Sequence, residues 1–192
     1  MKLLSKNLLL SSSFNKKTLI ILGLFCFVIN TNAQQNFIPN PSFEKIDSCP
    51  VYANSIQLAQ PWDTLKNGGG AGPDLFAECG AVGLSIPLGF IQGYQYARSG
   101  KVFMNSDFYA YPLPNLYPYY HDYMQTPLLD TLQSGKIYCV TFYVNLSNRS
   151  KYAIADIGAY FDDGRVSTCW YCPAIVNPQV VSPANVYIND TI

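Results

Sequence analysis

Residues 136–146 read KIYCVTFYVNL, and this stretch carries the strongest indication of the fold class. Its positions 138, 140, 142, 144 and 146 are all apolar, whereas the positions between them carry Cys, Thr, Tyr and Asn. Successive side chains of a β-strand point to opposite faces of a sheet, so the alternation predicts a strand with one buried side.

Weaker strand patterns, separated by Gly, Pro, Asn and Asp, occupy much of the remaining chain. Residues 152–161 alternate in the same way, and Gly158 within them indicates a bulge or the close approach of another backbone. No segment shows helical periodicity over three turns, so we expect an all-β protein, an antiparallel β-sandwich. Further strands are predicted at 36–38, 42–45, 88–96, 101–106, 119–127 and 180–188.

The first 33 residues have the features of a secretory signal peptide. Four lysines and no acidic residue precede or flank the apolar run at 18–29, which is too short to span a bilayer, and Ala33 gives a small residue before Gln34. We therefore predict export through the Sec pathway, cleavage after residue 33, and a single domain over 34–192 without a transmembrane helix. The expected location is secreted or cell-surface, including association with the outer membrane.

Charge narrows the range of partners. Residues 1–33 hold 4 of the 12 Lys and Arg and none of the 12 Asp and Glu, which leaves 8 against 12, a net charge of −4, for the remainder. This balance gives no overall electrostatic footprint for nucleic acid or anionic lipid. All fifteen tyrosines also lie after residue 33. Such a composition favours neutral partners.

Five cysteines follow residue 33, and in an oxidising compartment disulfides are their expected state. Cys49 and Cys79 both lie in loop-like sequence and are the expected pair, closing a loop of about thirty residues. Cys169 and Cys172 form a CxxC motif, for which we favour a local disulfide over a redox or zinc site. Cys139 would then remain unpaired.

Several motifs resemble the galactose-binding-domain-like jelly rolls, the fold of many carbohydrate-binding modules. These are the opening NFIPNPSFE at 36–44, the Gly-Lys strand start at 100–101, and LQSGKIYCVTFYV at 132–144. In those modules a structural calcium is commonly held near the N-terminal strand. By the resemblance, its ligands here would be the Glu44 carboxylate and the Lys101 carbonyl, and hard oxygen ligands of this kind suit calcium.

The order of motifs along the chain resembles more closely the N-terminal modules of cell-surface proteins from gliding Gram-negative bacteria. SCP at 48–50, PWD at 61–63, PDLFAEC at 73–79, GYQY at 93–96 and IGAYF at 157–161 carry this likeness. Those modules often precede a peptidoglycan-binding domain like that of outer membrane protein A, or a C-terminal signal for type IX secretion. They also add a Trp-bearing strand and a closing strand that have no counterpart here, so we expect a sandwich that lacks its last strands and a chain that is a fragment.

A tyrosine- and proline-rich stretch, FYAYPLPNLYPYY at 108–120, is the candidate binding site. Three prolines stiffen it, and tyrosines on a stiff loop offer flat apolar rings with a polar tip to a sugar or to a protein. Rings folded back to cover the sandwich remain an alternative. The candidate ligand-binding residues are Tyr109, Tyr111, Tyr117, Tyr119 and Tyr120.

Catalytic patterns are weak. The single histidine, His121, lies in an apparent strand without a nucleophile motif such as GxSxG, and Asp162, Asp163 and Gly164 form a turn pattern. We therefore expect no enzyme. The sequence predicts a non-catalytic surface module that binds a glycan. The alternatives are a structural or adhesion spacer that contacts other envelope or surface proteins and, more weakly, an accessory part of a glycan hydrolase.

Overall fold

The computed structural model describes residues 35–65, 72–89, 92–108, 121–166, 174–183 and 186–188. The chain separates into two compact units, 1–36 and 37–192, and everything below concerns the second. The predicted signal peptide, Cys169 and Cys172 lie outside the described residues. Within those residues, no helix is long and apolar enough to cross a membrane.

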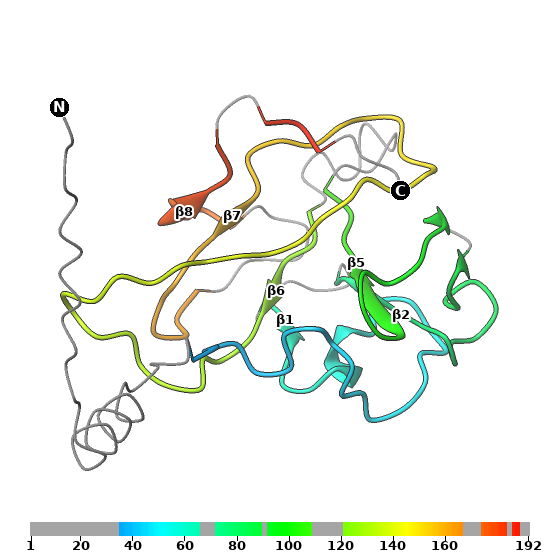
Figure 1. The fold of residues 1–192 in the computed structure, drawn as a ribbon, viewed down its shortest axis with the longest axis horizontal. Helices are drawn as coiled ribbons and strands as arrows, with labels where there is room; N and C mark the ends of the chain where they lie inside the picture. Colours follow the sequence, from blue (N-terminus) through cyan, green and yellow to red (C-terminus); the bar gives the residue numbers. More distant parts are fainter. Residues whose placement is uncertain are drawn as a thin grey trace, which may run out of the picture. The chain divides into compact units, whose positions relative to one another are not determined.

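The described chain is all-β and contains short antiparallel strand pairs (Figure 1). β1 pairs with β6, β2 with β5, β3 with β4, and β7 with β8. The predicted all-β class is therefore confirmed at the level of small antiparallel sheets. The elements are η1 (Ile56–Leu58), β1 (Asp63–Thr64), β2 (Asp74–Ala77), β3 (Leu88–Gly89), β4 (Gly93–Tyr94), β5 (Val102–Asn105), β6 (Met124–Gln125), β7 (Gly158–Ala159) and β8 (Val180–Val181).

The core is built around the β2–β5 pair. Leu75 faces Met104 and Ala77 faces Val102 across the ladder, so these side chains share one side of the pair. The buried cluster on that side comprises Ala59, Leu75, Ala77 and Val102, with Phe43, Ile46, Leu58, Trp62 and Met104 packed against it. On the other side Phe76, which is fully buried, stacks on Phe103 with ring centroids 5.3 Å apart.

The NPSFE motif folds into a turn rather than a strand. The Asn40 side chain accepts a hydrogen bond from Lys45 N–H (3.0 Å) and donates one to the Lys45 carbonyl (2.9 Å). Phe43 has a φ of 62°, in the left-handed region that a strand cannot use, so the strand predicted at 42–45 is wrong. The turn places the Phe43 ring 5.0 Å from the Trp62 ring, over the core.

The next residue, Glu44, binds the backbone at the start of β5. Its Oε1 accepts hydrogen bonds from Lys101 N–H (2.9 Å) and Val102 N–H (3.0 Å), across 57 and 58 positions of sequence. Its carboxylate occupies the space that a side chain at Gly100 would fill, and Gly100 has a φ of +70°. Only glycine suits that position, because any other residue would meet both the carboxylate and the strained backbone.

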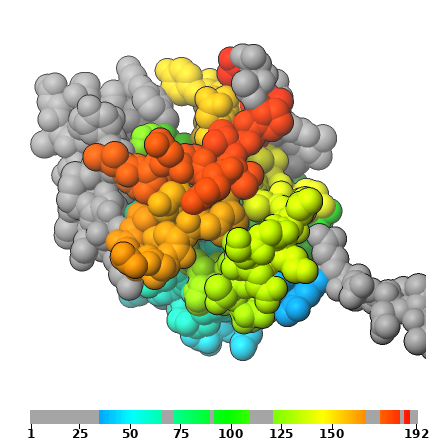
Figure 2. Space-filling model, turned by 90° about the vertical axis from the view of Figure 1, so that its left-hand side faces the viewer, coloured from blue at the N-terminus to red at the C-terminus, as the bar shows by residue number. Residues whose placement is uncertain are grey.

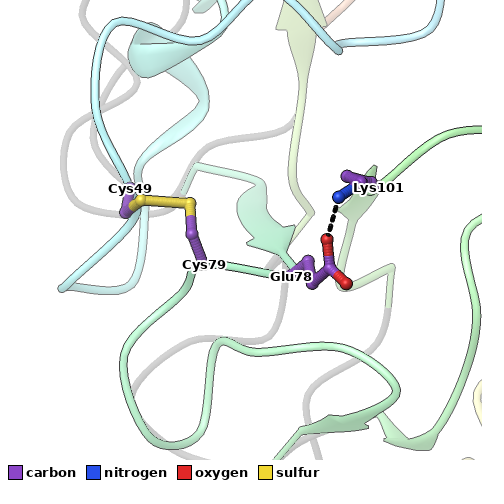
Figure 3. The surroundings of a disulfide bond; sticks show 4 residues. All are labelled: Cys49, Glu78, Cys79 and Lys101. Atoms are coloured by element: carbon purple, nitrogen blue, oxygen red, sulfur yellow. Dashed lines mark ion pairs between the residues drawn. A yellow bond between two sulfur atoms is a disulfide. The ribbon is translucent and has the colours of Figure 1, made fainter.

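The predicted Cys49–Cys79 disulfide is present, and it joins the same two regions a second time (Figure 3). Its Cα atoms are 5.5 Å apart. Glu78, next to Cys79, forms an ion pair with Lys101 (2.5 Å) and donates its backbone N–H to the Lys101 carbonyl (3.0 Å). Because disulfides persist in oxidising compartments, this bond indicates a non-cytoplasmic protein.

The strand predicted at 136–146 is not a regular strand. The segment is extended but has no ladder partner in the described chain, and Figure 1 draws it without an arrow. Ile137 is fully exposed, and positions predicted to be buried are also open to solvent, with Tyr138 37 %, Phe142 42 % and Val144 48 % exposed. The prediction of a paired strand with one buried side is therefore wrong for this segment.

The other predicted strands shorten for local reasons. Within 152–161, Asp156 has a φ of 57°, which interrupts the strand and leaves β7 paired with β8. Figure 2 shows these two segments, orange and red, against each other on one face. Gly158 does mark a close approach, because a Cβ there would lie 2.9 Å from Pro178. The predicted strand at 88–96 is instead the β3–β4 pair, in which the chain reverses direction. The strand predicted at 36–38 is absent. Each of the other three predicted ranges contains one shorter strand: β5 in 101–106, β6 in 119–127 and β8 in 180–188.

Glu44 and Glu78 allow a matched test of the N-terminal anchor. We expect Glu44→Ala to lower the free energy of unfolding by about 1–3 kcal/mol, because it removes two charge-assisted hydrogen bonds to backbone amides. Glu78→Ala removes only an exposed ion pair and should change stability little. Urea unfolding of the two variants beside the wild type checks this. Equal losses for both variants would contradict the assignment.

Candidate functional site

The five tyrosines predicted to bind a ligand, Tyr109, Tyr111, Tyr117, Tyr119 and Tyr120, lie outside the described residues. The structure instead brings together a second group of aromatic and amide side chains. We call this group the tyrosine surface, and it comprises Tyr94, Gln95, Tyr96, Arg98, Tyr143 and Asn145.

Tyr94 and Tyr96 form the exposed aromatic part of this surface. Their rings meet edge to face with centroids 5.5 Å apart, and their hydroxyls share a hydrogen bond of 3.0 Å. That hydrogen bond raises the pKa of Tyr94. The two side chains are 55 % and 61 % exposed. Two rings held against each other in solvent form a preorganised apolar contact with hydroxyls at its edge.

Arg98 and Tyr143 extend the surface across to the segment after residue 136. The Arg98 guanidinium carbon lies 3.4 Å from the centroid of the Tyr143 ring, a close cation–π contact. Asn145 donates a hydrogen bond from its amide nitrogen to Gln95 Oε1 (2.7 Å). Stacking and hydrogen bonding therefore fix the positions of polar groups beside the exposed rings.

The two segments that carry the surface run side by side in opposite directions. The Ser147 hydroxyl donates to the Gln92 carbonyl (2.9 Å), and Asn145 and Tyr143 then meet residues 95 and 98 in turn. Gly93, with a φ of +79°, lies close to the side chains of Asn148 and Arg149. Side chains of residues 92–98 are thus held in place by contacts with residues 143–149, although the two segments are about fifty positions apart in the sequence.

The GYQY motif at 93–96 contributes to the resemblance, but no binding role was predicted for it. A signal was present, because Tyr94 and Tyr96 are two positions apart and leave an extended chain on the same side. The contribution of Tyr143 and Asn145 had no such signal. They reach the surface only because residues 143–149 pack beside residues 92–98.

Glu44 and Lys101, the predicted calcium ligands, do lie together, but their contacts are those of a carboxylate on backbone amides. Glu44 Oε1 already accepts two N–H groups, and the Lys101 carbonyl accepts the Glu78 N–H. No group of three or more His, Cys, Asp or Glu suited to a metal ion occurs among the described residues. Both oxygens predicted to bind calcium therefore already accept backbone hydrogen bonds. Calcium at Glu44 and Lys101 stays a prediction from the resemblance.

The residues that flank the tyrosine- and proline-rich stretch are tied to each other. Asp107 N–H donates to Asp122 Oδ2 (2.7 Å), and Asp122 N–H donates to the Asp107 carbonyl (2.8 Å). His121 Nδ1 lies 2.8 Å from the Phe108 carbonyl oxygen. His121 therefore has a hydrogen bond to the backbone of the first residue of this stretch.

Burial and nearby carboxylates set the charge of Asp122. The residue is 7 % exposed, and its Oδ1 is buried without a hydrogen-bond partner. Burial, followed by the negative charges of Asp107 and Asp74, raises the pKa of Asp122 to about 7, although the bond from Asp107 N–H opposes the shift. Burial also raises the pKa of Asp74 and of Asp107.

The acidic pair at 162–163 forms the turn that the sequence predicts. Gly164 N–H and Val166 N–H donate to the two Asp162 oxygens, at 2.9 and 2.8 Å, and these bonds lower the pKa of Asp162. Asp163 pairs with Arg165. Each acidic group is thus occupied by its own turn, which favours a local structural role.

Asp122 gives a testable dependence of stability on pH. Because its pKa is raised in the folded chain, folding is favoured while the group is protonated, and stability falls as the pH rises from about 4 to about 7. We expect a loss on the order of 2–4 kcal/mol over that interval. Asp122→Asn should flatten this slope and stabilise the chain at pH 8. Urea unfolding between pH 4 and 8 measures it.

Asp156→Asn is the matched control, because Asp156 is exposed and asparagine tolerates its positive φ. This variant should keep the wild-type slope. A wild-type chain whose stability is constant from pH 4 to 8, or an Asp122→Asn variant with an unchanged slope, would show that the buried carboxyl group is not responsible.

Comparisons with protein-family models, with curated proteins and with solved structures found no match. Function is therefore argued from the residues of this chain.

Proposed function

We propose that the chain is a non-catalytic, exported β-sandwich module of the jelly-roll type, secreted or held at the cell surface, that binds a glycan through the tyrosine surface. The observation that supports this most is the pair of exposed, mutually supported rings of Tyr94 and Tyr96 beside the fixed amides of Gln95 and Asn145. Sugars present C–H faces that stack on aromatic rings and hydroxyls that hydrogen-bond to amides.

The energetics of such a surface suit modest, reversible binding. Edge-to-face contact already restricts both tyrosine rings, so a ligand orders few additional side chains. The Gln95–Asn145 hydrogen bond likewise fixes the two amides before a ligand arrives. Preorganisation of this kind lowers the entropic cost of binding. Binding of the same ligand by the tyrosines between 109 and 120 stays a prediction from the sequence.

A structural or adhesion spacer is the second candidate, and the segment 136–146 favours it. Ile137, Phe142 and Val144 are exposed by 100 %, 42 % and 48 %. An extended chain with exposed apolar side chains can pack against a neighbouring envelope or surface protein. Under this alternative, the tyrosine surface contributes to protein contacts and binds no sugar.

A glycan array with the purified chain, followed by titration of the best ligand, separates the two candidates. We expect Tyr94→Ala and Tyr96→Ala each to weaken binding about tenfold or more, through lost ring contact. Tyr52→Ala, which removes an exposed tyrosine at another place, should have no effect. Tyr117→Ala and Tyr119→Ala test the stretch predicted from sequence. If no sugar binds at millimolar concentration, the glycan proposal is wrong and the spacer remains.

A further inference from the structure

The tyrosine surface lies within an unusual distribution of charge. Residues 79–106 and 131–155 contain no Asp or Glu, yet they hold five of the eight Lys and Arg that follow residue 33. The other positions after residue 33 therefore carry all twelve acidic residues and three basic ones. The net charge of −4 conceals this separation, which matters because residues 92–98 and 143–149, parts of the two acid-free stretches, run side by side in the fold. The five are Arg98, Lys101, Lys136, Arg149 and Lys151.

The arginines of this region are placed at the tyrosine surface. Arg98 stacks on Tyr143, and the side chain of Arg149 packs over Gly93, next to Tyr94. The third arginine after residue 33, Arg165, pairs with Asp163 at another turn. Two of these three arginines thus flank the exposed rings.

No carboxylate in the described part of the chain forms an ion pair with Arg98. Two acidic residues contact the neighbouring residues 100–102, but each has a partner other than Arg98. Glu44 accepts hydrogen bonds from backbone amides, and Glu78 forms an ion pair with the Lys101 ammonium group. At a distance of only 3.4 Å between the guanidinium carbon and the Tyr143 ring centroid, an edge-on approach would bring a nitrogen too close to the ring, so the guanidinium group faces the ring. The N–H groups lie in the guanidinium plane, so a stacked arginine keeps the fork that pairs bidentately with an oxyanion.

From these observations, we propose that the ligand of the tyrosine surface is an anionic glycan, and that Arg98 binds its carboxylate or sulfate group. This inference rests on the proposed glycan-binding function and adds the chemical class of the sugar. Tyr94 and Tyr96 would stack on the ring, and Arg98 would pair with the oxyanion beside it. It replaces the expectation of a neutral partner, which followed from the net charge and the tyrosine-rich composition.

The test uses three polymers with the purified full chain: polygalacturonate, dextran sulfate and a neutral β-1,4-galactan. We expect an anionic polymer to bind at least tenfold more tightly than the neutral galactan. Arg98→Gln should remove most of that preference, a loss of about 10- to 100-fold, because charge-assisted pairs are the strong ones. Arg98→Lys keeps the positive charge but loses the two parallel N–H donors, so its affinity for the anionic polymer should lie between those of the wild type and Arg98→Gln. Whether polygalacturonate or dextran sulfate binds better identifies the oxyanion as carboxylate or sulfate.

Arg165→Gln is the matched control, since it removes the same charge from an exposed arginine away from the surface. It should leave all affinities unchanged. An equal loss in this variant, or equal binding of a single-stranded polynucleotide, would mean unspecific attraction of polyanions and overturn the inference. Equal binding of charged and neutral polymers with no effect of Arg98→Gln would also overturn it, while leaving the glycan proposal intact. Binding to no polymer and to no arrayed glycan would overturn both.

Discussion

A single carboxylate connects the N-terminal motif to the strand pair that forms the core. Glu44 accepts the N–H groups of Lys101 and Val102, and it can do so only because Gly100 leaves room for it. The turn at Asn40 sets Glu44 in place and sends Phe43 to Trp62 over the same core. The Cys49–Cys79 disulfide, which spans 30 positions of sequence, connects the N-terminal region to the β2–β5 pair a second time. Removing the carboxylate would leave two amides at the start of β5 without their acceptor, next to the best-packed part of the chain.

This anchor also links the core to the tyrosine surface. Residues 94–98 lead directly into Gly100 and β5, so the position of Arg98 depends on how the start of β5 is held. The surface receives its second half from residues 143–149, which contact residues 92–98 through side chains. Aromatic rings, amides and arginines from distant parts of the sequence thereby come to one place.

Sequence reasoning predicted the all-β class, the Cys49–Cys79 bond and the turn at 162–164. It succeeded where a local rule decides the outcome: the lack of helical periodicity, cysteines in loops and turn residues. It missed β2, because a four-residue strand buried on both faces shows no alternation. It extended strands through Phe43 and Asp156, because a single left-handed residue leaves no trace in a hydrophobic pattern. The tyrosine surface and the separation of charge escaped it for another reason. They depend on which segments lie side by side, which no local pattern contains.

Amide hydrogen exchange at Lys101 and Val102 tests the central claim, that the Glu44 carboxylate holds the start of β5. We expect both amides to exchange as slowly as the amide of Glu78, which donates to the Lys101 carbonyl in the same ladder, although Lys101 is exposed and precedes the strand. Exchange at residues 101 and 102 as fast as that of the exposed turn at Gly135 would contradict it. In that case the N-terminal motif would not be bound to the core in solution.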